Sequence, residues 1–162
     1  MENRNLQIIH SLNHLISISE DGKQWYENAA NFAIETSMQN TFCKYALQKS
    51  FYKAQLQKQL VELGGTAEKT WHPFSSLQLA WIDFKSVFIS TDTRAIIKAS
   101  IAREETAVKY YKIELQNEFI TDYLHAVLEA QLPGIEWIIA EIKSKYFTNN
   151  TEQVLYNRTI FS

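Results

Sequence analysis

The chain is poor in residues that break helices, with only 4 Gly and 2 Pro among its 162 residues. A β-sandwich needs many turns, so this scarcity excludes that class and favours long helices. The single cysteine, Cys43, excludes an intramolecular disulfide and is typical of a reducing compartment. No stretch approaches the roughly 20 apolar residues that cross a bilayer, and no signal-peptide core follows Met1. We therefore expect a cytoplasmic protein with no membrane partner.

The chain also lacks an excess of charge of one sign. Its 16 basic and 18 acidic residues give a formal net charge of -2 and are mixed along the sequence. A nucleic-acid interface would require a basic face, so we expect no nucleic-acid partner. Hydrophobic residues make up 46% of the chain, which is enough to build a full core in one domain.

Apolar residues at helical spacing are the main positive signal. Residues 6–33 carry a seam with alternating spacings of three and four, as in a bundle helix. Ser19 and Gly22 stand in the middle of this seam. We interpret these small residues as room for a close neighbouring helix or for large aromatic side chains opposite.

A second helix is predicted over residues 37–63. Thr36 and Gln39 have the spacing of a capping box, and Gly64 and Gly65 are suited to end the helix. Its expected apolar face consists of Phe42, Ala46, Leu47, Ser50, Phe51, Ala54, Leu56, Leu60 and Leu63.

The second half of the chain predicts one short and two long helices. Ser75 and Gln78 have capping-box spacing for the short helix, which carries an apolar stripe at Leu77, Trp81, Phe84 and Phe88. Ser90, Thr91 and Asp92 can cap a long helix over 93–117, whose seam is Ile97, Ile101, Glu104, Val108, Tyr111 and Leu115.

A last helix over 121–146 contains Pro133 and Gly134, where we expect a kink or a short break. The whole is an all-α four-helix bundle over 6–146, followed by a polar C-terminal tail over 147–162.

Several local motifs, taken in order, resemble those of one bacterial family. In the first half they are Leu12-Asn13-His14-Leu15-Ile16, Glu20-Asp21-Gly22 with Tyr26 and Ala29-Ala30, and Leu63-Gly64-Gly65. In the second half they are Trp81-Ile82-Asp83-Phe84-Lys85, Arg94-Ala95-Ile96-Ile97, Arg103-Glu104-Glu105-Thr106-Ala107 and Gln131. With this order and spacing, residues 6–146 resemble family 2383 of the domains of unknown function.

This resemblance implies a ferritin-like fold. The full expectation is an all-α, ferritin-like up-down four-helix bundle with an extra short helix between the second and third long helices. The family's members are small cytoplasmic bacterial proteins, some linked to stress responses, and the resemblance implies no particular reaction. The family often has an acidic residue where Ile101 stands and a His where Ile139 stands. Both are apolar here, so metal or acid–base chemistry in the bundle centre is less expected than in relatives.

A di-iron carboxylate bundle needs a Glu from each of two helices and a Glu-x-x-His pair from each of the other two. The chain contains no Glu-x-x-His, and its nearest match is Asp122-x-x-His125. One interpretation is half of a metal site; the other, which we favour, is a helix-start acid beside an exposed or capping His. We therefore predict no catalytic site, cofactor or metal, and keep Glu104, Asp122 and His125 as candidate ligands.

Glu104 is a charged residue on a core seam, which is costly unless it is paired. It is either a metal ligand surviving from a ferritin-like ancestor or a satisfied structural group. In the second case, which we favour, its partner is a Tyr hydroxyl, Gln131, Lys49 or Lys53.

Two further polar features have spacings that could support chemistry. His10 and His14 lie four apart, which can bind a metal, but no acidic residue stands at a matching spacing. Cys43 has Phe42 and Tyr45 as neighbours, so we predict a buried, inert thiol.

Three functions are compatible with these patterns. The first, which we favour, is a non-enzymatic bundle that forms a homodimer or binds a protein partner. The second is a metal-binding, ferritin-like oxidoreductase or iron-handling protein that uses Glu104 with some of Glu27, Glu129, Asp122 and His125. The third is a small-ligand carrier with a pocket among the aromatic residues and Ser19 and Gly22.

Overall fold

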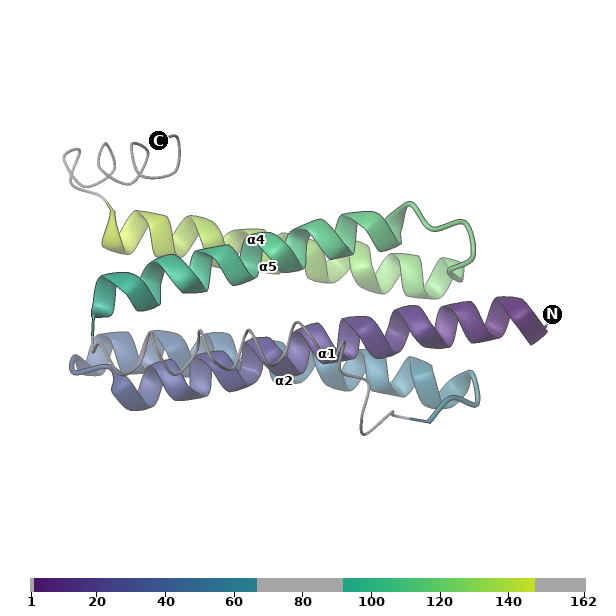
Figure 1. Ribbon diagram of the computed structural model, residues 1–162, viewed down its shortest axis with the longest axis horizontal. Helices are drawn as coiled ribbons and strands as arrows, with labels where there is room; N and C mark the ends of the chain where they lie inside the picture. Colours follow the sequence, from purple (N-terminus) through teal and green to yellow (C-terminus); the bar gives the residue numbers. More distant parts are fainter. Residues whose placement is uncertain (1, 67–91, 148–162) are drawn as a thin grey trace.

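The computed structural model describes residues 2–66 and 92–147, and all of its regular structure in these ranges is helical (Figure 1). The helices are α1 (Glu2–Phe32), α2 (Thr36–Glu62), α4 (Thr93–Leu115) and α5 (Asp122–Tyr146). The predictions of an all-α fold and of four long helices are confirmed. The expected short helix with Trp81, and the tail beyond Phe147, lie outside the described residues.

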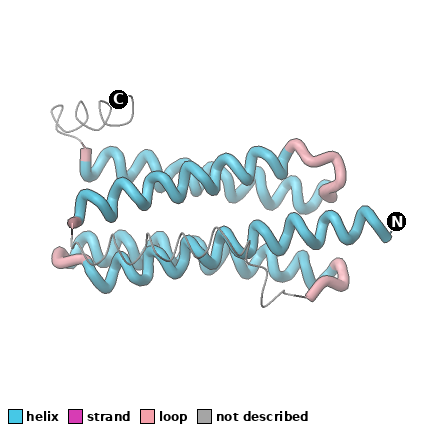
Figure 2. The backbone as a smooth tube through the Cα atoms, viewed as in Figure 1, coloured by secondary structure: helices cyan, strands magenta, loops and turns pink. Residues whose placement is uncertain are grey.

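The four helices pair as two hairpins, α1 with α2 and α4 with α5. The hairpins pack against each other so that α1 lies beside α4 and α2 beside α5. Their turns lie at opposite ends of the bundle (Figure 2). All neighbouring helices therefore run antiparallel, whereas α2 and α4, on the diagonal, run in the same direction (Figure 1).

Local signals set most of the helix ends. Gly64 has φ 75°, and the amides of Gly64 and Gly65 donate to the carbonyls of Val61 and Leu60 at 2.9 Å each. These two bonds form a Schellman motif, which a glycine in the left-handed region makes without strain. The Asp92 side chain accepts a hydrogen bond from the Arg94 amide at 3.0 Å and caps α4 as predicted.

The capping box predicted for α2 is wrong. Glu35 stands at the N-cap position and makes no side-chain cap, while Thr36 is already the first helical residue. The Gln39 side chain instead donates to the carbonyl of Ala33 at 2.7 Å. The turn between α1 and α2 is therefore tied through this amide rather than through a threonine hydroxyl.

Of the kink or short break expected at Pro133, the short break does not occur, since α5 is one helix from Asp122 to Tyr146. Proline removes one backbone donor from a helix interior, which costs stability unless packing compensates. The neighbouring Gly134 carbonyl accepts a hydrogen bond from the Gln48 side chain at 3.1 Å. Packing against α2 thus supports α5 next to its proline.

The core consists of two apolar clusters, one toward each end of the bundle. One is built around Trp25, Phe42, Ile101 and Ile138, and the other around Leu12, Leu56, Leu124 and Leu128. Buried polar side chains stand among them: Ser11, Asn13, Ser19, Thr41, Lys49, Gln59, Ser100, Glu104 and Gln131. The core is therefore not purely apolar, and its charged members lie in the middle of the bundle.

The apolar face predicted for α2 is partly wrong. Leu56 and Leu60 are buried, but Leu47 is 72% and Phe51 60% exposed, and Ala54 is also exposed. The buried stripe of α2 instead includes Tyr45 and Lys49. The helix is thus rotated so that a lysine faces the core and a leucine and a phenylalanine face outward.

Candidate functional site

The charged centre of the bundle is formed by Lys49, Glu104 and Tyr26. The Lys49 Nζ lies 2.6 Å from the Glu104 Oε2, and the Tyr26 hydroxyl donates to Oε1 at 2.7 Å. The side chains of Lys49 and Glu104 are only 5% and 2% exposed. Of the partners predicted for a satisfied Glu104, the structure shows a tyrosine hydroxyl and Lys49.

Gly22 makes room for the lysine. A Cβ atom at this position would lie 3.3 Å from the Cγ and Cδ atoms of Lys49, which is tighter than ordinary contact. The small residue on the α1 seam therefore accommodates the aliphatic part of Lys49, and not an aromatic ring. A lysine can follow such a path because its methylene stem packs like an apolar side chain.

Tyr111 and Gln131 extend the polar centre toward the end of the bundle that holds the apolar cluster around Leu12 and Leu56. The Tyr111 hydroxyl donates to the Gln131 Oε1 at 2.7 Å, and the Gln131 Nε2 donates to the Gln55 Oε1 at 2.9 Å. On the opposite side of the centre, the Trp25 indole donates to the Ser100 hydroxyl at 2.8 Å. These bonds satisfy buried polar groups that would otherwise destabilise the core.

Tyrosine acidity reflects this environment. Burial raises the pKa of Tyr26 well above its ordinary value of 10.0, and the nearby Glu104 carboxylate raises it further. Burial likewise raises the pKa of Tyr111. Both hydroxyls are therefore held neutral and act as hydrogen-bond donors rather than as acids.

The carboxylate of Glu104 is held by side chains of the chain itself. Both oxygens of Glu104 are already engaged, one by an ammonium group and one by a hydroxyl. Within residues 2–66 and 92–147, no group of three or more His, Cys, Asp or Glu side chains could hold a metal ion. A metal at Glu104 would have to displace the Lys49 ammonium, which is the nearest positive charge.

The other candidate ligands do not meet at Glu104. Asp122 is the exposed first residue of α5, and His125 lies 3.6 Å from Glu129 on the same helix. Glu27 lies 3.7 Å from Lys23 near the surface of α1. The structure therefore places Asp122 as a helix-start acid, as the favoured interpretation predicted.

His10 and His14 lie on α1, and the His14 ring packs edge-on against Tyr110 of α4 at 4.6 Å between centroids. Burial lowers the pKa of His14, and the charge of Glu114 opposes this effect. His14 thus takes part in packing between α1 and α4.

The prediction for Cys43 is wrong, because its side chain is exposed. Phe42 and Tyr45 are buried, but one helical residue corresponds to about 100° of rotation, so Cys43 faces outward. Neighbours in sequence were a poor guide to the environment of this thiol.

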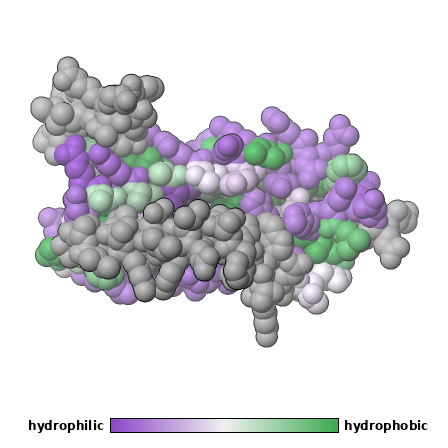
Figure 3. Space-filling view, in the orientation of Figure 1, coloured by the Kyte–Doolittle hydropathy of each residue, from purple (hydrophilic) through white to green (hydrophobic). Residues whose placement is uncertain are grey.

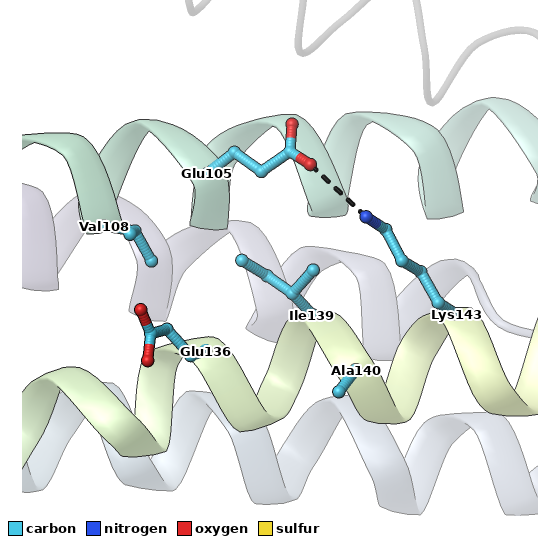
Figure 4. Close-up of a pocket in the computed structure, with 6 residues that line it drawn as sticks. All are labelled: Glu105, Val108, Glu136, Ile139, Ala140 and Lys143. Carbon is cyan, nitrogen blue, oxygen red and sulfur yellow. Dashed lines mark ion pairs between the residues drawn. The ribbon is translucent and has the colours of Figure 1, made fainter. Parts of the chain in front are cut away.

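A shallow groove on the surface between α4 and α5 was not anticipated from the sequence (Figure 4). Its lining consists of Glu105, Val108, Glu136, Ile139, Ala140 and Lys143. Ile139, which we had placed in the core, is only partly buried and forms part of this lining. No local spacing in the sequence could have revealed this groove, because its lining depends on how α4 and α5 pack side by side.

The fold and these sites define a class of protein. It is a four-helix bundle with a buried Lys–Glu ion pair at its centre and a groove with apolar residues on its surface. The chain belongs to the domain of unknown function family DUF2383, whose model matches residues 7–117. The match covers α1, α2 and α4 and ends before α5, so it is shorter than the resemblance over 6–146. No curated protein matches the chain. No helix in the described part of the chain is long and apolar enough to cross a membrane.

Proposed function

We propose that this protein is a non-enzymatic helical bundle that acts by association, either with a second copy of itself or with another protein. The observation that carries the proposal is the ion pair between Lys49 and Glu104 at 2.6 Å. Within the part of the chain that the structure describes, Glu104 is the one buried carboxylate, and the chain's own Lys49 neutralises it. Its role is then structural, and function is left to the surface.

The surface supports association. Large apolar side chains are exposed on several helices, among them Leu47 and Phe51 on α2, Ile113 on α4 and Trp137 on α5. Apolar patches interrupt the mainly hydrophilic surface in the space-filling view (Figure 3). Contiguous apolar surface on a folded domain is a common mark of protein interfaces.

We also propose that the bundle is ferritin-like and that residues 6–146 form one domain, with 147–162 as a tail. The parallel direction of α2 and α4 supports this assignment (Figure 1). Ferritin-like bundles have one long crossover connection, which joins two helices that run in the same direction. In this proposal the chain keeps the ancestral scaffold, and Lys49 replaces the metal as the partner of Glu104.

Two measurements on the full chain test this function. Protein purified without chelators is loaded with iron(II) and manganese(II), desalted and analysed for metal. Its mass in solution is then measured by sedimentation over a wide range of concentration. We expect the loaded protein to hold far less than one metal ion per chain. We also expect its mass in solution to rise with its own concentration, or when a binding protein is added.

A stable content of two metal ions per chain would overturn the proposal and favour the iron-handling alternative. A Glu104→Gln variant, loaded with metal at a temperature where circular dichroism shows that it is still folded, distinguishes a central site from surface binding, because only a central site would lose its metal. A strictly monomeric protein at high concentration would remove self-association and leave only the binding of another protein.

A further inference from the structure

The groove between α4 and α5 has an apolar floor and charged corners (Figure 4). The floor is made by Val108, Ile139 and Ala140, and the groove has a volume of about 390 Å³. At one end Glu105 lies 3.5 Å from Lys143 across the groove. At the other end Lys112 lies 3.4 Å from Glu136.

The four corner charges alternate in sign around the groove. On α4 the acid Glu105 is followed two turns later by the base Lys112, and on α5 the acid Glu136 is followed by the base Lys143. Each helix therefore presents one acid and one base, and the two ion pairs have opposite orientations across the groove.

We propose that this groove is the surface on which a second copy of the chain docks. The inference rests on the proposed function and names its partner and its interface. A face-to-face dimer has a two-fold axis in the plane of the face, either along or across the helices. Because the corner charges alternate, either axis sets each Glu of one copy opposite a Lys of the other.

This pattern favours a second copy over an unrelated partner. A surface of one charge sign would repel its own copy and would select an oppositely charged protein. The alternating corners are instead complementary to themselves, and the apolar floors of the two copies meet between them. Charges at the rim of such an interface fix its register, while the apolar centre supplies the burial.

The size of the face is compatible with a stable dimer. Helices of 23 and 25 residues are roughly 35 Å long and each about 10 Å wide with side chains, so side by side they offer a face of roughly 700 Å². A standard interface buries about 800 Å² per partner. A small residue, Ala140, at the groove allows the second copy to approach closely.

Charge reversal tests the inference directly. The double variant Glu105→Lys with Glu136→Lys makes all four corners positive, and the double variant Lys112→Glu with Lys143→Glu makes them all negative. Each variant alone should dimerise about tenfold or more weakly than the natural chain, because every facing pair becomes repulsive. An equimolar mixture of the two should restore dimers, since all facing pairs are then attractive.

A matched control changes the same charges on the other hairpin. Glu27→Lys with Glu62→Lys alters the net charge as much as the all-positive variant does, at side chains that are 51% and 54% exposed. This control should leave the dimerisation constant within about twofold of the natural value, because exposed charges far from an interface affect association weakly. Circular dichroism and thermal unfolding report whether each variant keeps the bundle, which the loss of exposed ion pairs should hardly disturb.

The outcomes separate the inference from the function on which it rests. Dimers lost in both groove variants, kept in the control and restored by mixing support the groove as the interface. Dimers that survive both groove variants overturn the groove while leaving self-association in place. A natural chain that stays monomeric at all concentrations overturns the groove together with the self-association part of the proposed function.

Discussion

The Lys49 ammonium lies 2.6 Å from the Glu104 carboxylate, and this ion pair joins α2 to α4 across the diagonal of the bundle. Tyr26 of α1 completes the cluster by donating to the second carboxylate oxygen. Taking two charges out of water is costly, and only close pairing with further hydrogen bonds compensates for it. The three side chains therefore depend on one another.

Removing the charge of Glu104 should strongly destabilise the fold. Glu104→Gln leaves the Lys49 ammonium buried without a counter-charge, and we expect a loss of about 3–5 kcal/mol in the free energy of unfolding. Urea titration followed by circular dichroism measures this loss. The neighbouring Glu105→Gln is the matched control and should change stability by no more than about 1 kcal/mol, because its ion pair is exposed.

Replacing both charges at once should be far less harmful. The double variant Lys49→Met with Glu104→Leu, made in a Tyr26→Phe background so that no buried hydroxyl loses its acceptor, removes the desolvation cost along with the attraction, and such replacements are often neutral or stabilising by about 1–4 kcal/mol. A double variant as unstable as Glu104→Gln would argue that the pair itself, and not the orphaned charge, holds the bundle together.

Gly134→Ala should destabilise the protein, although alanine is the better helix former. An added Cβ would clash with the Tyr52 hydroxyl and lie 3.0 Å from the Gln48 Nε2. We expect a cost of about 1–3 kcal/mol, as for other overpacked sites. In a Tyr52→Phe background the hydroxyl is gone, so the same substitution should cost less. Equal costs in the two backgrounds, measured as a double-mutant cycle, would contradict this account of the close approach.

Alkaline pH should unfold the protein together with tyrosine ionisation. Burial raises the pKa of Tyr26, Tyr45 and Tyr111 above the ordinary 10.0. A raised folded-state pKa contributes stability that is complete below the unfolded-state pKa and is lost as pH rises above it. We therefore expect stability to fall above about pH 10. Tyrosinate absorbance and helical circular dichroism, followed in one titration, should change together; full ionisation of all 8 tyrosines before helix is lost would contradict this.

Cys43 should react under native conditions. Its side chain is exposed on α2, so a thiol reagent can reach it without unfolding. We expect complete modification in buffer at a rate close to that in denaturant. Mass spectrometry of the labelled protein with time measures this rate. A thiol that reacts only after urea is added would mean that this side of α2 is covered in solution.

The helices and their ends were largely predictable, because they depend on residues close together in the chain. The Schellman motif at Gly64 and the Asp92 cap are local hydrogen-bond patterns, and both appear where the sequence predicted them. The α2 capping box failed because Gln39 found a partner in the preceding turn, at Ala33. Gln39 could bond within a capping box or to the preceding turn, and the spacing of residues alone does not say which bond forms.

That Glu104 would have polar partners was also predictable, but which lysine pairs with it was not. A buried charge must be paired, so the position of Glu104 on an apolar seam indicated a partner. Choosing Lys49 over Lys53 depended on the rotation of α2 about its axis. Lys53 lies one helical turn further along and pairs with Glu20 near the surface.

Local patterns in the chain were enough to predict its long helices, where most of them begin and end, and that Glu104 on its apolar seam has polar partners. Packing between the helices sets which face of α2 is buried, leaves Leu47, Phe51 and Cys43 exposed, and forms the groove between α4 and α5. Helix formation is governed by contacts within a few residues. The rotation and pairing of helices are set by packing between segments distant in the chain, which no local spacing encodes.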